Sequence, residues 1–133
     1  PLPGLNQVLD WTEKCGLKRA LVTNAPRKNV EFILSVLNLT ETFAPVVLAE
    51  EAAAPKPDPA PYKLALNLLD IAPEQAVAFE DSPSGIRSAV GAGILTIGIA
   101  STHEPQTLQK AGALMVVPNF TAEALWNLLK GNQ

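Results

Sequence analysis

The sequence predicts an α/β fold in which a mostly parallel sheet is covered by helices on both faces. Five short apolar segments of strand character alternate with segments whose apolar residues recur at helical spacing. A helical segment follows each strand, which is the connection that parallel neighbours require. The chain has 133 residues, of which 47% are hydrophobic and 17% charged, so it suffices for one domain with a buried core.

The first half of the chain is expected to form two helices and two strands. The first helix, Leu5–Cys15, has apolar residues on one face and ends at Gly16. A strand over Lys18–Thr23 follows, and Pro26 suits the first turn of the second helix. The apolar face of that helix should contain Val30, Ile33, Leu34 and Leu37. A short apolar strand over Val46–Ala49 completes this half.

The second half begins with a stiff loop over Ala52–Pro61, whose four prolines exclude a helix interior. Pro61 can open the next helix. The elements expected after it are a strand over Ala76–Phe79, a helix over Ser84–Ala92, a strand over Leu95–Ile99, a helix over Thr107–Ala111, a strand over Met115–Val117 and a helix over Ala122–Lys130 capped by Thr121. Ligands of such sheets bind beyond the carboxyl ends of the strands, so polar residues at those ends are the candidates for function.

The charge and hydropathy of the chain exclude several kinds of partner. A formal net charge of −3 gives no basic surface for nucleic acid, and no apolar run approaches the roughly 18 residues that can cross a bilayer. We therefore expect no nucleic acid and no membrane as partner. No secretory signal is recognisable, so the cytoplasm is the default location. Because the chain begins with Pro1 and not with Met, we expect a truncated or processed product.

For a few other residues we favour packing or a surface position over a functional role. Cys15 is the only cysteine, which excludes an internal disulfide, and we expect it to pack in a helix. Trp11 and Trp126 lie on apolar helix faces and should also pack. His103, the only histidine, is expected on a surface loop, and Arg27 at a helix start suits solvent exposure as well as an anion.

Three polar clusters follow three of the predicted strands. Thr23 and Asn24 offer a hydroxyl and an amide at a strand end, where they could bind an anion or cap a helix. Lys56 stands between two prolines, so a restricted backbone presents its charge, and phosphate is a natural target. Glu80 and Asp81 directly follow an apolar strand and provide the hard oxygen ligands that suit Mg²⁺, unless they form a solvated acidic turn.

The order and wording of these clusters resemble the haloacid dehalogenase superfamily, in its phosphoglycolate-phosphatase and β-phosphoglucomutase-like branch. VTN resembles the second motif of that family, KPDP the third and FEDSPSGI the fourth. The resemblance covers nearly the whole chain. It implies a Rossmann-like three-layer sandwich and a Mg²⁺-dependent hydrolase that acts on a small phosphorylated metabolite.

The resemblance also implies a role for each motif residue. Thr23 would bind the transferring phosphoryl group, with Asn24 assisting. Lys56 would neutralise charge on that group and hold the nucleophile. Glu80 and Asp81 would hold Mg²⁺ directly or through water. In the family, an aspartate attacks the phosphate ester and the aspartyl phosphate is then hydrolysed, which splits one difficult displacement into two.

The first motif of the family, an Asp-x-Asp at the end of an apolar strand, is missing. The four aspartates of the chain form no such pair; they are Asp10, Asp58, Asp70 and Asp81. Asp10 lies within a predicted helix and is no substitute. The cap that selects substrates in this branch is also missing. We therefore expect residues 1–133 to form a partial core domain, without the central nucleophile strand, that is inactive alone.

The missing strand would leave two strand edges unpaired, at about 1–3 kcal/mol for each buried unpaired backbone group. We expect one of three remedies. A separate N-terminal fragment may supply the strand, the strands ending at Thr23 and Glu80 may pair with each other, or a second copy may fill the gap.

Two alternatives from other classes stay open at this point. The chain could be a non-catalytic module that keeps an anion site and works through partner binding. A phosphoacceptor domain of response-regulator type would need a receiving aspartate, for which Asp81 is available, but the expected acidic cluster is absent from the sequence.

Overall fold

The computed structural model describes residues 2–37, 39 and 42–131 and confirms an α/β fold with parallel strands. Its elements, in chain order, are α1 (Leu5–Lys14), β1 (Leu21–Thr23), α2 (Arg27–Val36), β2 (Val46–Leu48), the 3₁₀ turn η1 (Ala49–Glu51), α3 (Ala60–Leu69), the 3₁₀ turn η2 (Pro73–Gln75), β3 (Val77–Glu80), α4 (Pro83–Gly91), β4 (Leu95–Ile99), α5 (Pro105–Lys110), β5 (Met115–Val117) and α6 (Glu123–Gly131). Each predicted helix and strand is present near its expected position. None of the helices in the described part of the chain is long and apolar enough to cross a membrane.

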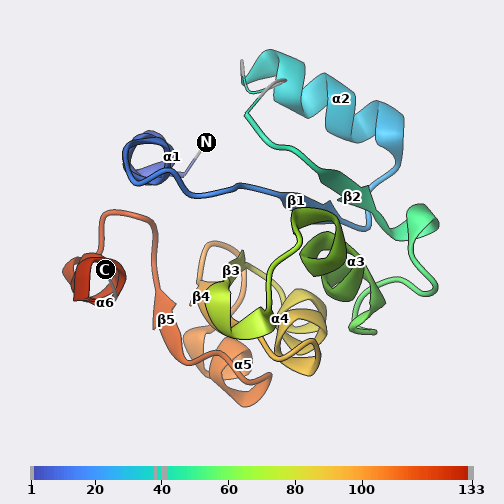
Figure 1. Cartoon of the computed structure of the whole chain (residues 1–133). Coiled ribbons are helices and arrows are strands. Elements are labelled where there is room, and N and C mark those ends of the chain that lie inside the picture. Colours follow the sequence, from blue (N-terminus) through green and yellow to red (C-terminus); the bar gives the residue numbers. More distant parts are fainter. Residues whose placement is uncertain (1, 38, 40–41, 132–133) are drawn as a thin grey trace.

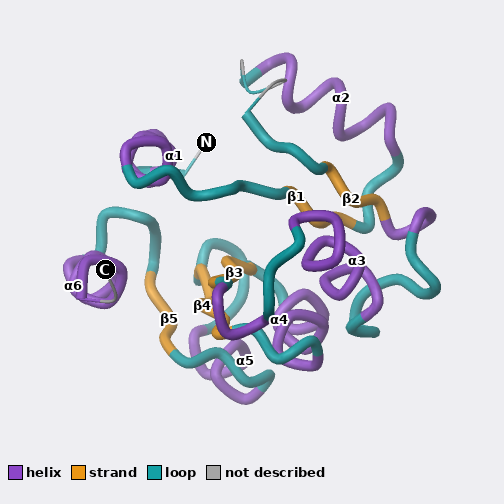
Figure 2. The backbone as a smooth tube through the Cα atoms, in the orientation of Figure 1, coloured by secondary structure: helices purple, strands orange, loops and turns teal. Residues whose placement is uncertain are grey.

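The strands form two separate sheets (Figures 1 and 2). In the first, β1 pairs with β2, and Leu21 lies beside Val46. In the second, β4 lies between β3 and β5, and Ile97 lies beside Met115. Among the described residues, β1 and β3 do not pair with each other. The expectation that these two strands close the gap directly is therefore wrong.

The first helix, α1, packs against the half of the molecule that contains β3, β4 and β5. Val8 of α1 is buried in the same apolar cluster as Ile97 of β4 and Leu125 of α6. The Trp11 and Trp126 rings meet edge to face, 6.0 Å apart, which confirms their expected packing. Figure 1 accordingly shows α1 and α6 side by side. Since α1 is held against the β3–β4–β5 half, the segment 15–20 spans the distance from that half to β1.

The third helix, α3, joins the two halves. Its Tyr62 and Leu66 pack with Ala78 of β3 and Ala89 of α4, and Val22 of β1 packs against the same cluster. Both sheets are thus attached to one helix layer while their facing edges stay apart. The fold positions the carboxyl ends of β1 and β3 without a strand between them.

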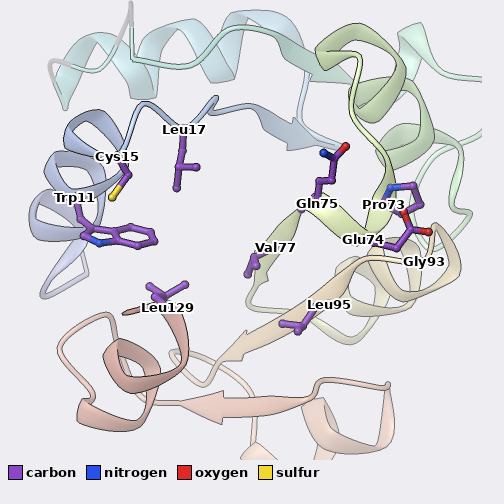
Figure 3. A pocket seen from close by; sticks show the side chains of 11 residues that line it. Trp11, Cys15, Leu17, Pro73, Glu74, Gln75, Val77, Gly93, Leu95 and Leu129 are labelled. Carbon is purple, nitrogen blue, oxygen red and sulfur yellow. The ribbon is translucent and has the colours of Figure 1, made fainter. Parts of the chain in front are cut away.

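A cavity of about 920 Å³ lies between the halves, at the amino ends of the strands (Figure 3). Its lining includes Trp11 of α1, Cys15 just after α1, Leu17 ahead of β1, Val77 of β3 and Leu129 of α6. Leu17 and Val77, which line this cavity, are 48% and 40% exposed. Cys15 is exposed at the end of α1, so the expectation that it packs inside a helix layer is wrong.

Two further local expectations are wrong. Ile33 is 52% exposed, because α2 turns only Val30 and Leu34 fully into the core. Thr121 does not cap the last helix: α6 begins two residues later, and the Thr121 hydroxyl donates to Asn119 Oδ1 at 2.5 Å.

Candidate functional site

The Lys56 side chain lies at the centre of the candidate site and connects the two sheets. Its ammonium group donates to the backbone oxygen of Val22 in β1 at 2.8 Å and to Glu80 Oε2 at the end of β3 at 2.5 Å. The Lys56 and Glu80 side chains are only 9% and 8% exposed. The carboxyl ends of β1 and β3 are therefore neighbours, and the buried Lys56 ammonium bridges them through a hydrogen bond to Val22 and an ion pair with Glu80.

The loop that carries Lys56 is fixed at two points. Asn24 holds the Lys56 backbone with both ends of its amide: Oδ1 accepts from the Lys56 N–H at 3.1 Å, and Nδ2 donates to the Lys56 oxygen at 3.4 Å. Ser88 of α4 donates to the backbone oxygen of Asp58 at 2.6 Å. Two predicted site residues, Asn24 and Lys56, are thus brought together. The Asn24 amide contacts backbone here, and its expected part in anion binding stays a prediction.

The Glu80 carboxylate is enclosed on its other sides by Tyr62 and Gly85. The Tyr62 hydroxyl donates to Glu80 Oε2, the oxygen that Lys56 also contacts. Burial, and then the negative charge of Glu80, raises the pKa of the Tyr62 phenol far above its usual range, so the phenol stays the donor. A Cβ at position 85 would lie 1.9 Å from Glu80 Oε1, so only glycine leaves room for this carboxylate.

Thr23 ends β1 beside the Lys56 contact. Its Oγ1 accepts from the Ala25 N–H at 3.0 Å, which leaves its own O–H able to donate to a ligand. Residue 26 is the N-cap of α2, with no side-chain cap bond, so Thr23 does not cap that helix. The helix-cap alternative is therefore wrong, and anion binding by Thr23 stays a prediction.

Asp81 follows β3 directly and is exposed, unlike its neighbour Glu80. Ser82 caps α4 by accepting from the Gly85 N–H at 3.1 Å, which turns the chain sharply after Asp81. Of the described residues, no three carboxylate, histidine or cysteine side chains gather into a metal site. Two adjacent carboxylates, one buried and one exposed, nevertheless suit Mg²⁺, which keeps several waters and uses one or two protein carboxylates.

Two residues that we expected at the surface, His103 and Arg27, lie near this edge. His103 is exposed on the loop after β4, as expected, but its Nδ1 lies 3.0 Å from the backbone oxygen of Asp81. Arg27 pairs with Glu51 at 3.4 Å, with both side chains about half exposed. Tyr62 was not among the expected site residues. A signal for it was available, because a tyrosine on a helix face of leucine and alanine, soon after the KPDP segment, indicates a buried hydroxyl that needs a partner.

The buried ion pair makes a prediction about stability. A Lys56→Met variant should lose about 3–5 kcal/mol in free energy of unfolding, because it leaves the Glu80 carboxylate buried without its cation. Urea denaturation measures the loss. Arg27→Met is the matched control: it breaks a half-exposed ion pair and should cost no more than about 1 kcal/mol. Equal losses in the two variants would contradict the buried pair.

Comparison with known proteins places this arrangement in context. A family model described as haloacid dehalogenase-like hydrolase matches residues 1–99. A phosphorylated carbohydrates phosphatase of Thermotoga maritima is 35% identical over 130 residues, covering 96% of this chain and 59% of the relative. A validoxylamine A 7'-phosphate phosphatase of Streptomyces hygroscopicus subsp. limoneus is 32% identical over 112 residues, covering 84% of this chain and 53% of the relative.

Solved structures agree with the fold. CbbY from Rhodobacter sphaeroides in complex with phosphate aligns with a TM-score of 0.80 and 33% identity, over 90% of this chain and 54% of that chain. A HAD hydrolase of family IA, variant 3, from Entamoeba histolytica aligns with a TM-score of 0.84 and 27% identity, over 97% and 60%. The chain thus spans between about half and three fifths of the length of these proteins.

Proposed function

We propose that this chain, which belongs to the haloacid dehalogenase-like hydrolase family, provides the phosphate-binding and metal-binding part of a Mg²⁺-dependent phosphate-ester hydrolase. One observation carries the proposal. Lys56 reaches from its loop to β1 and β3 at once, so the residues at those two strand ends converge on one edge of the molecule. A hydroxyl, a cation and two carboxylates at one edge match the charges of a phosphate ester and a divalent metal ion.

Each residue has a distinct task in this proposal. Thr23 donates its hydroxyl hydrogen to a non-bridging phosphoryl oxygen. Lys56 supplies positive charge beside the reacting group, on a loop whose backbone Asn24 holds in place. Glu80 and Asp81 hold Mg²⁺, which when bound offsets negative charge on the phosphoryl group. Because Lys56 and Glu80 are held in place before the ligand arrives, little reorganisation of these two groups is needed when charge develops.

The nucleophile of the reaction comes from outside these 133 residues in our proposal. No Asp-x-Asp occurs in the chain, and Asp10, the remaining candidate near the amino end, lies within α1. We propose that an apolar strand ending in this pair, supplied by a further segment, occupies the gap between β1 and β3. Without that strand we expect no turnover by the family mechanism.

The proposed substrate is a small phosphorylated metabolite, whose identity would depend on residues beyond this chain. A net charge of −3 does not favour nucleic acid as a partner. We propose the cytoplasm as the location.

The second candidate function is a non-catalytic module that binds an anion at Thr23 and Lys56. The lack of an Asp-x-Asp in the chain favours this function. Both functions require the anion site, and only the first requires Mg²⁺ and turnover.

Binding of inorganic phosphate tests the anion site. In the presence of Mg²⁺, a Thr23→Val variant should bind phosphate at least about 10-fold more weakly than the parent chain, because a hydrogen bond to a charged ligand is worth about 1.5–3 kcal/mol. Isothermal titration calorimetry measures the affinity. Thr12→Val, which removes a hydroxyl bonded to the Leu9 backbone in α1, is the control and should bind normally. Equal affinity of the Thr23→Val variant and its parent would exclude Thr23 from the site.

A further inference from the structure

The Tyr62 hydroxyl makes a contact that packing alone does not require. The Tyr62 ring belongs to the apolar cluster of Leu66, Ala78 and Ala89, where a phenylalanine would fill the same space. Its hydroxyl is instead aimed at Glu80 Oε2. A buried hydroxyl needs a partner, but here the partner is a carboxylate that Lys56 already neutralises. The Tyr62 hydroxyl therefore adds a second hydrogen bond to this carboxylate.

Two donors from different elements converge on one oxygen of Glu80. Lys56 approaches from its loop and Tyr62 from α3, and each donates to Oε2. A single donor would leave the carboxylate able to rotate about that contact, whereas two donors and the backbone of Gly85 restrict it to one orientation. Within the described chain, no hydrogen bond reaches Oε1. The orientation of Oε1, which lies against Gly85, is set by the same contacts.

We infer that Tyr62 is a positioning residue for the metal site: through its hydroxyl it fixes Glu80, and with it the Lys56 ammonium, in the orientation that binds a divalent cation. This inference rests on the function proposed above. Mg²⁺ demands nearly ideal octahedral geometry, so a ligand held in one orientation binds it better than one that must be ordered first. Hydrogen-bond partners behind metal ligands typically contribute about 10–100-fold to metal affinity or activity.

A single substitution separates this role from packing. Tyr62→Phe keeps the ring and removes only the hydroxyl. With Mn²⁺ as the probe, followed by water-proton relaxation, the dissociation constant of the 133-residue chain should rise about 10-fold, and Mg²⁺ should compete correspondingly less well. Thr96→Val is the matched control, since it removes another buried hydroxyl, bonded to the Ile94 oxygen, away from the site. It should lower stability without changing Mn²⁺ affinity.

A second measurement needs no variant. Tyr62 is the only tyrosine of the chain, so 3-fluorotyrosine labels this position alone. Saturating Mg²⁺ should shift the fluorine resonance of the labelled chain.

The outcomes discriminate between the inference and the function on which it rests. If the parent chain binds Mn²⁺ and Tyr62→Phe binds it equally well, the positioning role is wrong and the proposed metal site stands. If the parent chain binds no Mn²⁺ and its fluorine resonance does not respond to Mg²⁺, the metal site fails, and the inference fails with it. Weaker Mn²⁺ binding in Tyr62→Phe, with normal binding in Thr96→Val, supports the role.

Discussion

A double variant with Glu80→Ala and Asp81→Ala should lose Mg²⁺ binding altogether, a fall of at least about 100-fold in affinity. These residues are the adjacent carboxylates after β3, and the described part of the chain offers no third ligand group beside them to take over. Calorimetric titration with Mg²⁺, supported by competition against Mn²⁺, measures the loss.

Two controls separate loss of ligands from loss of structure. Glu50→Ala with Glu51→Ala removes another adjacent acidic pair, which follows β2, and should leave Mg²⁺ affinity unchanged. Glu80→Gln with Asp81→Asn keeps the size of both side chains while removing their charge, and should lose Mg²⁺ as the alanine variant does. Unchanged Mg²⁺ affinity in the folded alanine variant would contradict the metal assignment.

Adding an apolar strand that ends in Asp-x-Asp should produce phosphatase activity, which we expect the chain alone to lack. A synthetic peptide with an apolar strand that ends in Asp-x-Asp should give Mg²⁺-dependent hydrolysis of p-nitrophenyl phosphate when mixed with the chain. The reason is that the open edges of β1 and β3 and the cavity between the halves provide backbone partners and apolar lining for such a strand. Release of p-nitrophenol measures the activity.

The matched peptide has asparagine in place of the first aspartate. It should bind to the chain equally well but give no turnover, because the nucleophile is gone; loss of a catalytic nucleophile can cost about 10⁶-fold in rate. Native mass spectrometry verifies that both peptides bind. Equal hydrolysis with the two peptides, or activity of the chain alone, would contradict the proposal that the nucleophile comes from outside these residues.

The sequence predicted the order of helices and strands because each element is specified locally. Alternating apolar segments and helical spacing are readable residue by residue, and β3, α4 and β4 lie close to their expected bounds. The sequence also predicted that polar residues after different strands would lie near one another, while their binding of phosphate and metal stays a prediction. Lys56 and Glu80 indeed lie near one another.

What the sequence could not predict depends on contacts between distant segments. That β1 and β3 stay unpaired, and that α1 packs against α6, are contacts between distant segments that no local pattern encodes. The contact of Tyr62 with Glu80 joins residues 18 positions apart on different elements. The interpretation of Asn24 was incomplete for the same reason: its side-chain amide contacts the backbone of Lys56, 32 positions away.

A crystal structure of the chain grown with Mg²⁺ and inorganic phosphate tests the central claim most directly. We expect Mg²⁺ coordinated by a carboxylate of Glu80 or Asp81, and phosphate within hydrogen-bonding distance of Thr23 Oγ1 and Lys56 Nζ, at the edge where β1 and β3 end. If neither ion were bound at that edge at saturating concentrations, while the Lys56–Glu80 pair remained intact, the structure would contradict a phosphate and metal site in this chain.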